Sequence, residues 1–313
     1  MVKKLPGVQR LADDTLLWRL YGRWRPDCVT LPGTERQIFV DPLENRGLAL
    51  LKNRAAGQPF LKRFWKSACA ELRPTAVLDI GLNYGEIVLA ETYPPATKIL
   101  GIEANPALTR WLERSRQIHP NATQLQFVYA LAGEQAAGEE NFYINEKWSG
   151  SSSAILDPSR PGVTSRTVPC VSVDGLWAGQ LTPADRLLFK IDVEGYEPPV
   201  LRGMRQTLAT CGQWLGIIEF NEEFFPRLGI DAGEFVAELA AQASLIALCH
   251  NGQLRPLPTA NLDDWHMILG EGPICVDLIL VSRGWECDFL SNWLAESAHH
   301  SSDSHSADNH PAA

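Results

Sequence analysis

The run Val77-Leu78-Asp79-Ile80-Gly81-Leu82-Asn83-Tyr84-Gly85-Glu86 sets the architecture expected for this chain of 313 residues. It is typical of a short apolar strand over 76–80, followed by a turn that contains Gly81 and Gly85. Glycine lets the backbone turn sharply and approach a ligand closely. In an open α/β sheet, ligands bind at the carboxyl ends of the strands, which is where this turn falls. The run therefore predicts a ligand site on the first strand of an α/β domain.

Two acidic residues indicate which kind of ligand this predicted site would bind. Asp79 lies inside the first strand, and Glu103 ends the next strand, about twenty residues further along, where α/β nucleotide-binding proteins hold ribose hydroxyls. A carboxylate there can accept charge-assisted hydrogen bonds from both hydroxyls. Asn83 stands where the dinucleotide fingerprint GxGxxG needs glycine, which disfavours a nicotinamide oxidoreductase. The chain has no GxxxxGKS or GxxxxGKT motif, so a P-loop protein is excluded.

Outward from this run, strand patterns alternate with helical patterns. The predicted strands lie at 37–40, 76–80, 98–102, 125–131, 141–144, 167–173, 187–193, 214–220, 245–249 and 274–281. The predicted helices lie at 57–72, 86–91, from Pro106 onward, at 197–208 and at 233–243. This alternation predicts a mostly parallel, doubly wound sheet with helices on both faces.

The ends of the chain differ from this body. Residues 1–56 are expected to form an N-terminal extension that packs on the main domain, 57–297. In the extension, Trp18, Tyr21 and Trp24 form an aromatic cluster, expected to pack on the domain, with docking on a membrane or partner as the alternative. This apolar segment also permits a homo-oligomer. Residues 298–313, rich in Ser, His and Asp, are expected to be disordered.

Composition excludes several classes of function. A formal net charge of −9 argues against nucleic acid as a partner, because phosphate binding needs a clustered positive surface. The seven cysteines are scattered without a CxxC pair, which predicts neither a zinc site nor a disulfide framework. No apolar run approaches the ~20 residues of a membrane-spanning helix, and no signal peptide is evident. A cytoplasmic protein is therefore expected.

A second signature is Leu188-Phe189-Lys190-Ile191-Asp192-Val193-Glu194-Gly195-Tyr196-Glu197. Alternate strand residues share a face, so Lys190, Asp192 and Glu194 point the same way. Three ionisable groups at a strand end are costly unless they are solvated, paired or bound to a ligand.

With these motifs in order, the sequence resembles the FkbM family of methyltransferases. The resemblance spans roughly residues 35–285 and rests on the segments 77–85, 101–106, 141–153 and 188–203. Leu82 departs from the alanine usual in the family. The resemblance implies a Rossmann-like class I methyltransferase fold, with S-adenosylmethionine as the methyl donor. It further implies O-methylation of a small acceptor, such as a sugar or a polyketide hydroxyl.

The resemblance also implies roles for individual residues. The expected cofactor-binding residues are Asp79, Gly81, Asn83, Gly85, Glu103 and Asn105. Ser152, in the serine-rich loop 149–153, and Glu197 are expected beside the acceptor. Glu219, which ends the strand at 214–220, also falls at the ligand-binding edge of the sheet and is expected to bound the acceptor pocket.

The catalytic base is left between three residues. A neutral hydroxyl acceptor benefits from a general base, and Asp192 or Glu194 is the leading candidate. His250, at the end of the strand over 245–249, is the competing base. A divalent metal held by Asp192, Glu194 or Glu197 is left open, although the spacing alone does not support one. The rival to an enzyme is a non-catalytic nucleotide- or partner-binding module, disfavoured by the completeness of both acidic sets.

Overall fold

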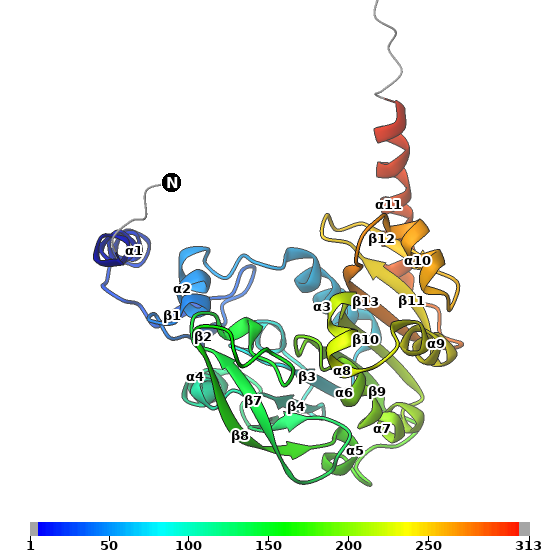
Figure 1. Cartoon of the computed structure of the whole chain (residues 1–313), viewed down its shortest axis with the longest axis horizontal. Coiled ribbons are helices and arrows are strands. Elements are labelled where there is room, and N and C mark those ends of the chain that lie inside the picture. The colour runs from blue at the N-terminus through cyan, green and yellow to red at the C-terminus, as the bar shows by residue number, and fades with distance from the viewer. Residues whose placement is uncertain (1–5, 307–313) are drawn as a thin grey trace, which may run out of the picture.

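The fold is built on an eight-stranded sheet, shown in a computed structural model that describes residues 6–306, with side-chain surroundings for 10–298 (Figure 1). The strands stand in the order β12-β11-β13-β10-β9-β3-β4-β5. Their bounds are β3 Ala76–Ile80, β4 Lys98–Ile102, β5 Leu125–Val128, β9 Arg186–Ile191, β10 Gln213–Asn221, β11 Ala243–Leu248, β12 Leu254–Leu257 and β13 Cys275–Ser282. All pairs from β10 to β5 are parallel, and the pairs involving β13 and β12 are antiparallel. The predicted α/β fold with a mostly parallel sheet is confirmed.

Helices cover both faces of this sheet because its strands are apolar on both sides. Val77 and Leu188 belong to one core cluster and their neighbours Leu78 and Phe189 to another. The first cluster lies under α3 (Pro59–Leu72), α4 (Thr109–Ile118) and α11 (Asp288–Ser306). The second lies under α6 (Glu197–Arg202), α7 (Arg205–Thr210), α9 (Ala232–Gln242) and α10 (Leu262–Leu269). The sheet is therefore doubly wound, as predicted.

Strand order creates the crevice in which a ligand can bind. β3 pairs with β4, the next strand of the sheet along the chain, on one side and with the much later β9 on the other. In open α/β sheets the ligand crevice lies at such a switch point, at the carboxyl ends of the strands. The two charged motifs of the sequence follow β3 and β9, so the topology brings them together.

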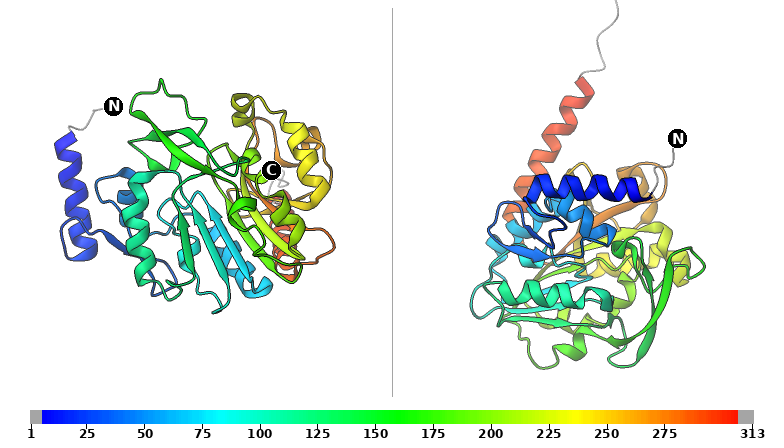
Figure 2. Two further views of the ribbon diagram at one scale, coloured as in Figure 1. Left: turned by 90° about the horizontal axis from the view of Figure 1, so that it is seen from below. Right: turned by 90° about the vertical axis from the view of Figure 1, so that its left-hand side faces the viewer.

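A small sheet and short helices fill the remaining connections. The small sheet has the order β6-β8-β7, with β6 Leu131–Ala132, β7 Glu139–Asn145 and β8 Val163–Val171 (Figure 2). The serine-rich loop forms a 3₁₀ turn, η3 (Ser149–Ser151), between β7 and β8. The other short helices are η1 Val88–Ala90, η2 Pro106–Leu108, α5 Val173–Leu176, η4 Glu222–Phe224 and α8 Phe225–Leu228.

The N-terminal segment contains α1 (Pro6–Tyr21), β1 (Cys28–Thr30), β2 (Gln37–Phe39) and α2 (Asn45–Lys52). The predicted aromatic cluster in this segment is divided. Tyr21 packs against the core, and its hydroxyl donates a hydrogen bond to the carbonyl of Leu51. Trp18 and Trp24 remain 49% and 60% exposed, with ring centroids 6.5 Å apart. Among the described residues, no helix is long and apolar enough to cross a membrane.

Several predicted elements differ from those observed. The helix predicted at 86–91 is only the turn η1, because Glu91 already has an extended backbone, with φ −114° and ψ 158°. The helix predicted at 197–208 divides into α6 and α7 at Gly203, where a Cβ would lie 1.9 Å from the carbonyl oxygen of Gly133. The strand predicted at 125–131 ends at Val128, and β6 joins the small sheet instead.

The C-terminal segment is helical further than predicted. α11 continues to Ser306, whereas disorder is expected from residue 298. Its first turns are anchored, because Leu290 and Trp293 are buried and the Glu71 carboxylate accepts hydrogen bonds from the N–H groups of Asp288 and Phe289. The rest of the expected tail, 307–313, lies outside the described residues.

A close packing contact in the sheet gives a stability prediction. Gly216 of β10 lies opposite Phe189 of β9, and a Cβ at Gly216 would lie 2.0 Å from the ring. Gly216→Ala should therefore lower the free energy of unfolding by about 1–3 kcal/mol, measured by denaturant titration. Phe189→Leu/Gly216→Ala should lose less than the sum of the single variants, because the smaller side chain gives the methyl room. An unfolding midpoint unchanged in Gly216→Ala would contradict this packing.

Candidate active site

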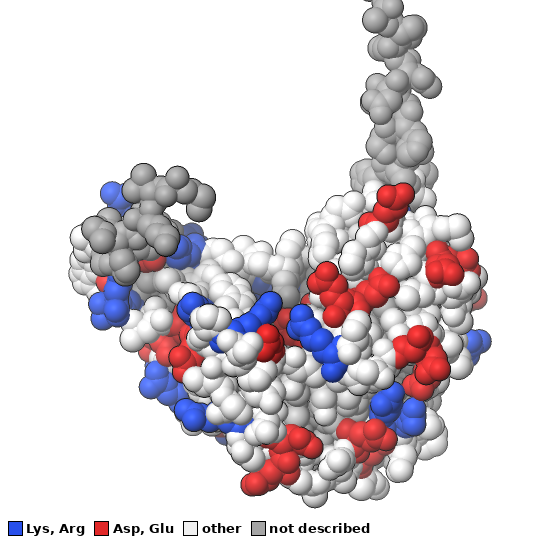
Figure 3. All heavy atoms as spheres, in the orientation of Figure 1, with Lys and Arg blue, Asp and Glu red and all other residues white. Residues whose placement is uncertain are grey.

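A cavity of about 410 Å³ opens at the carboxyl ends of β3, β4 and β9. Of the sequence-predicted site residues, it is lined by Asp79, Gly81, Asn83, Glu103, Ser152, Asp192 and Glu194. Arg46, Glu86, Trp148 and Lys190 line it as well. Acidic and basic side chains lie close together at the centre of the face that Figure 3 shows. The two sequence motifs thus meet in one pocket.

The turn after β3 depends on glycine. Gly81 has φ +80°, and a Cβ there would lie 1.9 Å from the carbonyl oxygen of Asp192. The Asp192 N–H donates to the carbonyl of Ile80 at 3.0 Å, which joins the ends of β3 and β9. Any side chain at position 81 would force these two strand ends apart.

Glu103 is held by the backbone of two turns. One of its carboxylate oxygens accepts from the Asn83 N–H at 2.8 Å, and the other accepts from the Asn105 N–H at 2.7 Å. Burial raises its pKa to about 7, although both hydrogen bonds oppose that shift. Each oxygen keeps a further lone pair, so the group can still accept from ribose hydroxyls. Asn105 itself caps η2 by accepting from the Ala107 N–H and does not line the cavity.

Lys190 pairs with two carboxylates. Its Nζ lies 3.4 Å from Asp79 Oδ1 and 3.3 Å from Asp192 Oδ2. Burial alone would lower the pKa of Lys190, but the two carboxylates outweigh it and hold that pKa above its ordinary value. Burial raises the pKa of Asp79, and Lys190 opposes that rise. Of the three charged residues that the sequence places on one strand face, Lys190 and Asp192 are therefore paired, and Glu194 is not.

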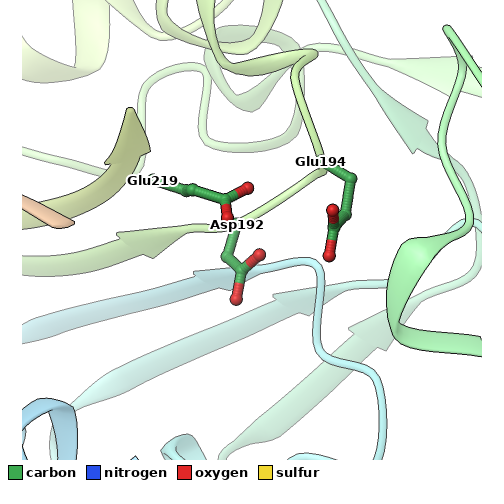
Figure 4. Close-up of side chains that lie close together, drawn as sticks. All are labelled: Asp192, Glu194 and Glu219. Carbon is green, nitrogen blue, oxygen red and sulfur yellow. The ribbon is translucent and has the colours of Figure 1, made fainter. Parts of the chain in front are cut away.

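Three carboxylates converge beyond Lys190. Asp192, Glu194 and Glu219 each present an oxygen such that all three oxygens lie within 4.8 Å of one another (Figure 4). Asp277 of β13 stands directly opposite Glu219 in the sheet register. Oxygen ligands in this arrangement could hold a divalent cation.

Burial and like charge raise the pKa values of this acidic cluster. Burial is the larger cause at each position, and the Asp192 carboxylate is the next. The pKa rises to about 8 for Glu194, to about 9 for Glu219 and to about 7 for Asp277. One oxygen of Glu219, Oε2, is buried without a hydrogen-bond partner among the described residues.

Some predicted site residues lie outside the cavity. Glu197 turns away from it, because its carboxylate accepts from the N–H groups of Val193 and Gly195. Gly85, with φ +77°, packs against Leu89. Glu219 joins the acidic cluster without lining this cavity.

His250 is exposed in the turn after β11 and is not brought to the cavity. Ser152 does line it, and the Ser152 hydroxyl accepts from the Asn145 N–H.

The sequence analysis missed several contributors. Glu44 caps α2, and its carboxylate also accepts hydrogen bonds from the Ser149 N–H and the Tyr84 hydroxyl. Arg46 of α2 forms an ion pair with Glu86 inside the cavity. Glu86 directly follows the glycine turn, which was a usable signal. The N-terminal residues carry no motif that points to the site.

Comparisons with known proteins bear on the family of this chain. The model of the methyltransferase FkbM domain matches residues 79–244, more than half of the chain. A search of curated proteins finds no match.

Solved structures similar to this chain include two O-methyltransferases. One is TomG from Streptomyces achromogenes, in complex with SAM. Its sequence is 13% identical to this chain, the match covers 72% of this chain and 80% of TomG, and the TM-score is 0.36. The other is from Bacillus cereus, in complex with SAH. Its sequence is 11% identical to this chain, the match covers 72% of this chain and 82% of the Bacillus cereus protein, and the TM-score is 0.40.

Glu103 gives a pH prediction for binding S-adenosylhomocysteine, the demethylated form of the donor. Its carboxylate is protonated below a pKa of about 7, so fewer ribose hydrogen bonds can be accepted there. Calorimetric affinity should therefore fall as pH drops from 8 to 6, by at most about tenfold per unit. Glu103→Gln should bind more weakly and lose this part of the pH dependence. The exposed variant Glu238→Gln is the control. If the affinity for S-adenosylhomocysteine changed with pH equally in Glu103→Gln and in this control, the expected role of Glu103 in binding the ribose would be contradicted.

Proposed function

Because the chain belongs to the FkbM family of S-adenosylmethionine-dependent methyltransferases, we propose that it methylates a hydroxyl oxygen of a small acceptor, such as a sugar or a polyketide. The observation that carries this proposal is Glu194, a carboxylate at the cavity whose pKa is raised to about 8. A general base works best when its pKa lies near the working pH.

The cavity fits the donor. Its volume of about 410 Å³ is within the range of small-molecule sites. Glu103 would hold the ribose, and Gly81 allows close approach of the ligand to the backbone. Asn83 has a buried oxygen, Oδ1, with no hydrogen-bond partner among the described residues, and a ligand N–H could satisfy it. When bound, S-adenosylmethionine supplies a methyl group on a positively charged sulfur that leaves as a neutral thioether.

Asp192 and Glu194 have different roles toward the acceptor. Asp192 is paired with Lys190, which fixes the direction of its side chain, so it orients the acceptor hydroxyl. Glu194 accepts the proton of that hydroxyl. Its backbone is held in a left-handed conformation, φ +55°, and its carbonyl accepts from the Ser153 hydroxyl at 2.8 Å. A base fixed in this way needs little reorganisation during the reaction.

The cavity lining favours a polyhydroxylated acceptor. Asp192 and Glu194 line the cavity and offer several carboxylate oxygens to the hydroxyl groups of such a molecule. Trp148 is 39% exposed and lines the cavity, so its ring can stack on a sugar. Two other tryptophans, Trp177 and Trp265, are buried in the core. We place the reaction in the reducing cytoplasm, in keeping with seven free cysteines.

The base can be tested by its titration. Turnover should be followed as release of S-adenosylhomocysteine with a panel of sugars and hydroxylated polyketides. Activity should rise with pH through about 8, because Glu194 must be deprotonated. Glu194→Gln should reduce kcat by about 10²–10⁴-fold and abolish this rise. Asp192→Asn should also reduce kcat and should move the rise to lower pH, because the Asp192 charge no longer raises the pKa of Glu194. Both variants should bind S-adenosylhomocysteine nearly as well as the wild type.

Controls separate this mechanism from its rivals. Glu238→Gln, on the surface at α9, should leave turnover unchanged. Activity should persist in a chelator, whereas a loss restored by a divalent cation would transfer the role of the cluster to metal binding. Unchanged turnover in both Asp192→Asn and Glu194→Gln would show that the general base does not belong to this cluster. Binding of S-adenosylhomocysteine with no turnover on any hydroxyl acceptor would favour a non-catalytic binding module.

A further inference from the structure

A buried ion pair from two distant segments stands in the cavity wall. Arg46 comes from α2, outside the segment that the FkbM model matches, and Glu86 follows the glycine turn after β3. Their side chains are only 16% and 6% exposed, and a guanidinium nitrogen of Arg46 bonds to Glu86 Oε1. Both residues line the cavity.

This pair is incompletely satisfied. Glu86 Oε2 is buried and has no hydrogen-bond partner among the described residues. Within the same part of the chain, the guanidinium makes one hydrogen bond although it carries several N–H donors. Burial lowers the pKa of Arg46, opposed by the Asp192 and Glu44 carboxylates. Buried charges left partly unpaired are costly, so an additional partner is expected at this point.

We propose that Arg46 and Glu86 bind the α-amino acid end of the methyl donor. An α-amino acid group joins a carboxylate to an ammonium, and the pair offers the complement of both. The free donors of Arg46 suit the carboxylate, because a guanidinium binds carboxylates through two parallel hydrogen bonds. Glu86 Oε2 suits the ammonium, and the unpartnered Asn83 Oδ1 lies in the same wall.

The position of the pair agrees with the rest of the site. Glu103, the predicted ribose ligand, and the Arg46–Glu86 pair line one cavity, with the glycine turn 81–85 between Glu86 and β3. A donor bound along this turn would therefore place its nucleoside at Glu103 and its amino acid end at Arg46. The inference rests on the use of S-adenosylmethionine in the proposed function. It adds that the N-terminal segment supplies a donor-binding residue.

Two ligands that differ only at this end provide the test. S-Adenosylhomocysteine and 5′-methylthioadenosine share the nucleoside and the thioether, but the second lacks the amino acid group. In calorimetric titrations, Arg46→Met should weaken S-adenosylhomocysteine binding by about 10–100-fold, the value of charged hydrogen bonds, and leave methylthioadenosine binding unchanged. Glu86→Gln should act in the same direction. Arg205→Met, which removes an exposed arginine paired with Glu238, should change neither affinity.

A variant that folds poorly does not obscure the result. Arg46→Met leaves Glu86 as an unpaired buried charge, so Arg46→Met/Glu86→Met is included to remove both charges together. The readout is the ratio of the two affinities, which does not depend on the folded fraction. A wild-type ratio retained in the variants, or equal losses for both ligands, would overturn the proposal.

The outcomes also separate this inference from the proposed function. If the wild type binds neither ligand, the donor assignment fails and the inference fails with it. If the variants lose the preference for S-adenosylhomocysteine while no hydroxyl acceptor is methylated, the inference stands and the O-methyltransferase proposal fails. An anionic acceptor as the true partner of Arg46 would leave the ratio of affinities unchanged, which counts against the inference.

Discussion

The contact of Lys190 with Asp79 and Asp192 is the constraint on which the site depends. It places a buried cation between the two strands at the switch point of the sheet. Without Lys190, the buried Asp79 carboxylate would lose its cation and the partly exposed Asp192 would lose its partner, and a buried charge without its partner is strongly destabilising. Because Lys190 also donates to the Gly81 carbonyl, the same contact fixes the turn after β3. One side chain thus holds together the ends of β3 and β9, which carry the residues proposed to bind the methyl donor and the acceptor.

The N-terminal segment completes what this contact begins. Glu44 joins α2 to the serine-rich loop and to Tyr84 of the glycine turn, so three segments distant in sequence are tied by one carboxylate. Arg46, two residues later, then reaches Glu86. The N-terminal segment lies outside the residues that the family model matches, and it forms one wall of the cavity. The cavity is therefore bounded by this segment as well as by the strand ends of the sheet.

The sequence predicted most of what depends on local pattern. Asp79, Glu103 and Asp192 were found because each lies at the carboxyl end of a strand, and parallel strands bring those ends together. Glu197 was misplaced because a carboxylate near a turn serves the backbone as readily as a ligand, and only the fold shows which. Arg46 and Asp277 could not be found, since they reach their neighbours through long-range packing and antiparallel register.

The acidic cluster joins the function of this site to the stability of the fold. Glu194, Glu219 and Asp277 have pKa values near 8, 9 and 7 in the folded chain, well above the ordinary values of 4.5, 4.5 and 3.8. At a pH between the ordinary pKa and the raised pKa of each group, the folded state binds more protons than the unfolded state. The free energy of unfolding therefore falls as pH rises from the ordinary values toward the raised ones. The burial that raises the pKa of Glu194, the base we propose, is therefore also what makes its ionised form unfavourable. The base that we propose at Glu194 would therefore depend on the stability of the surrounding sheet.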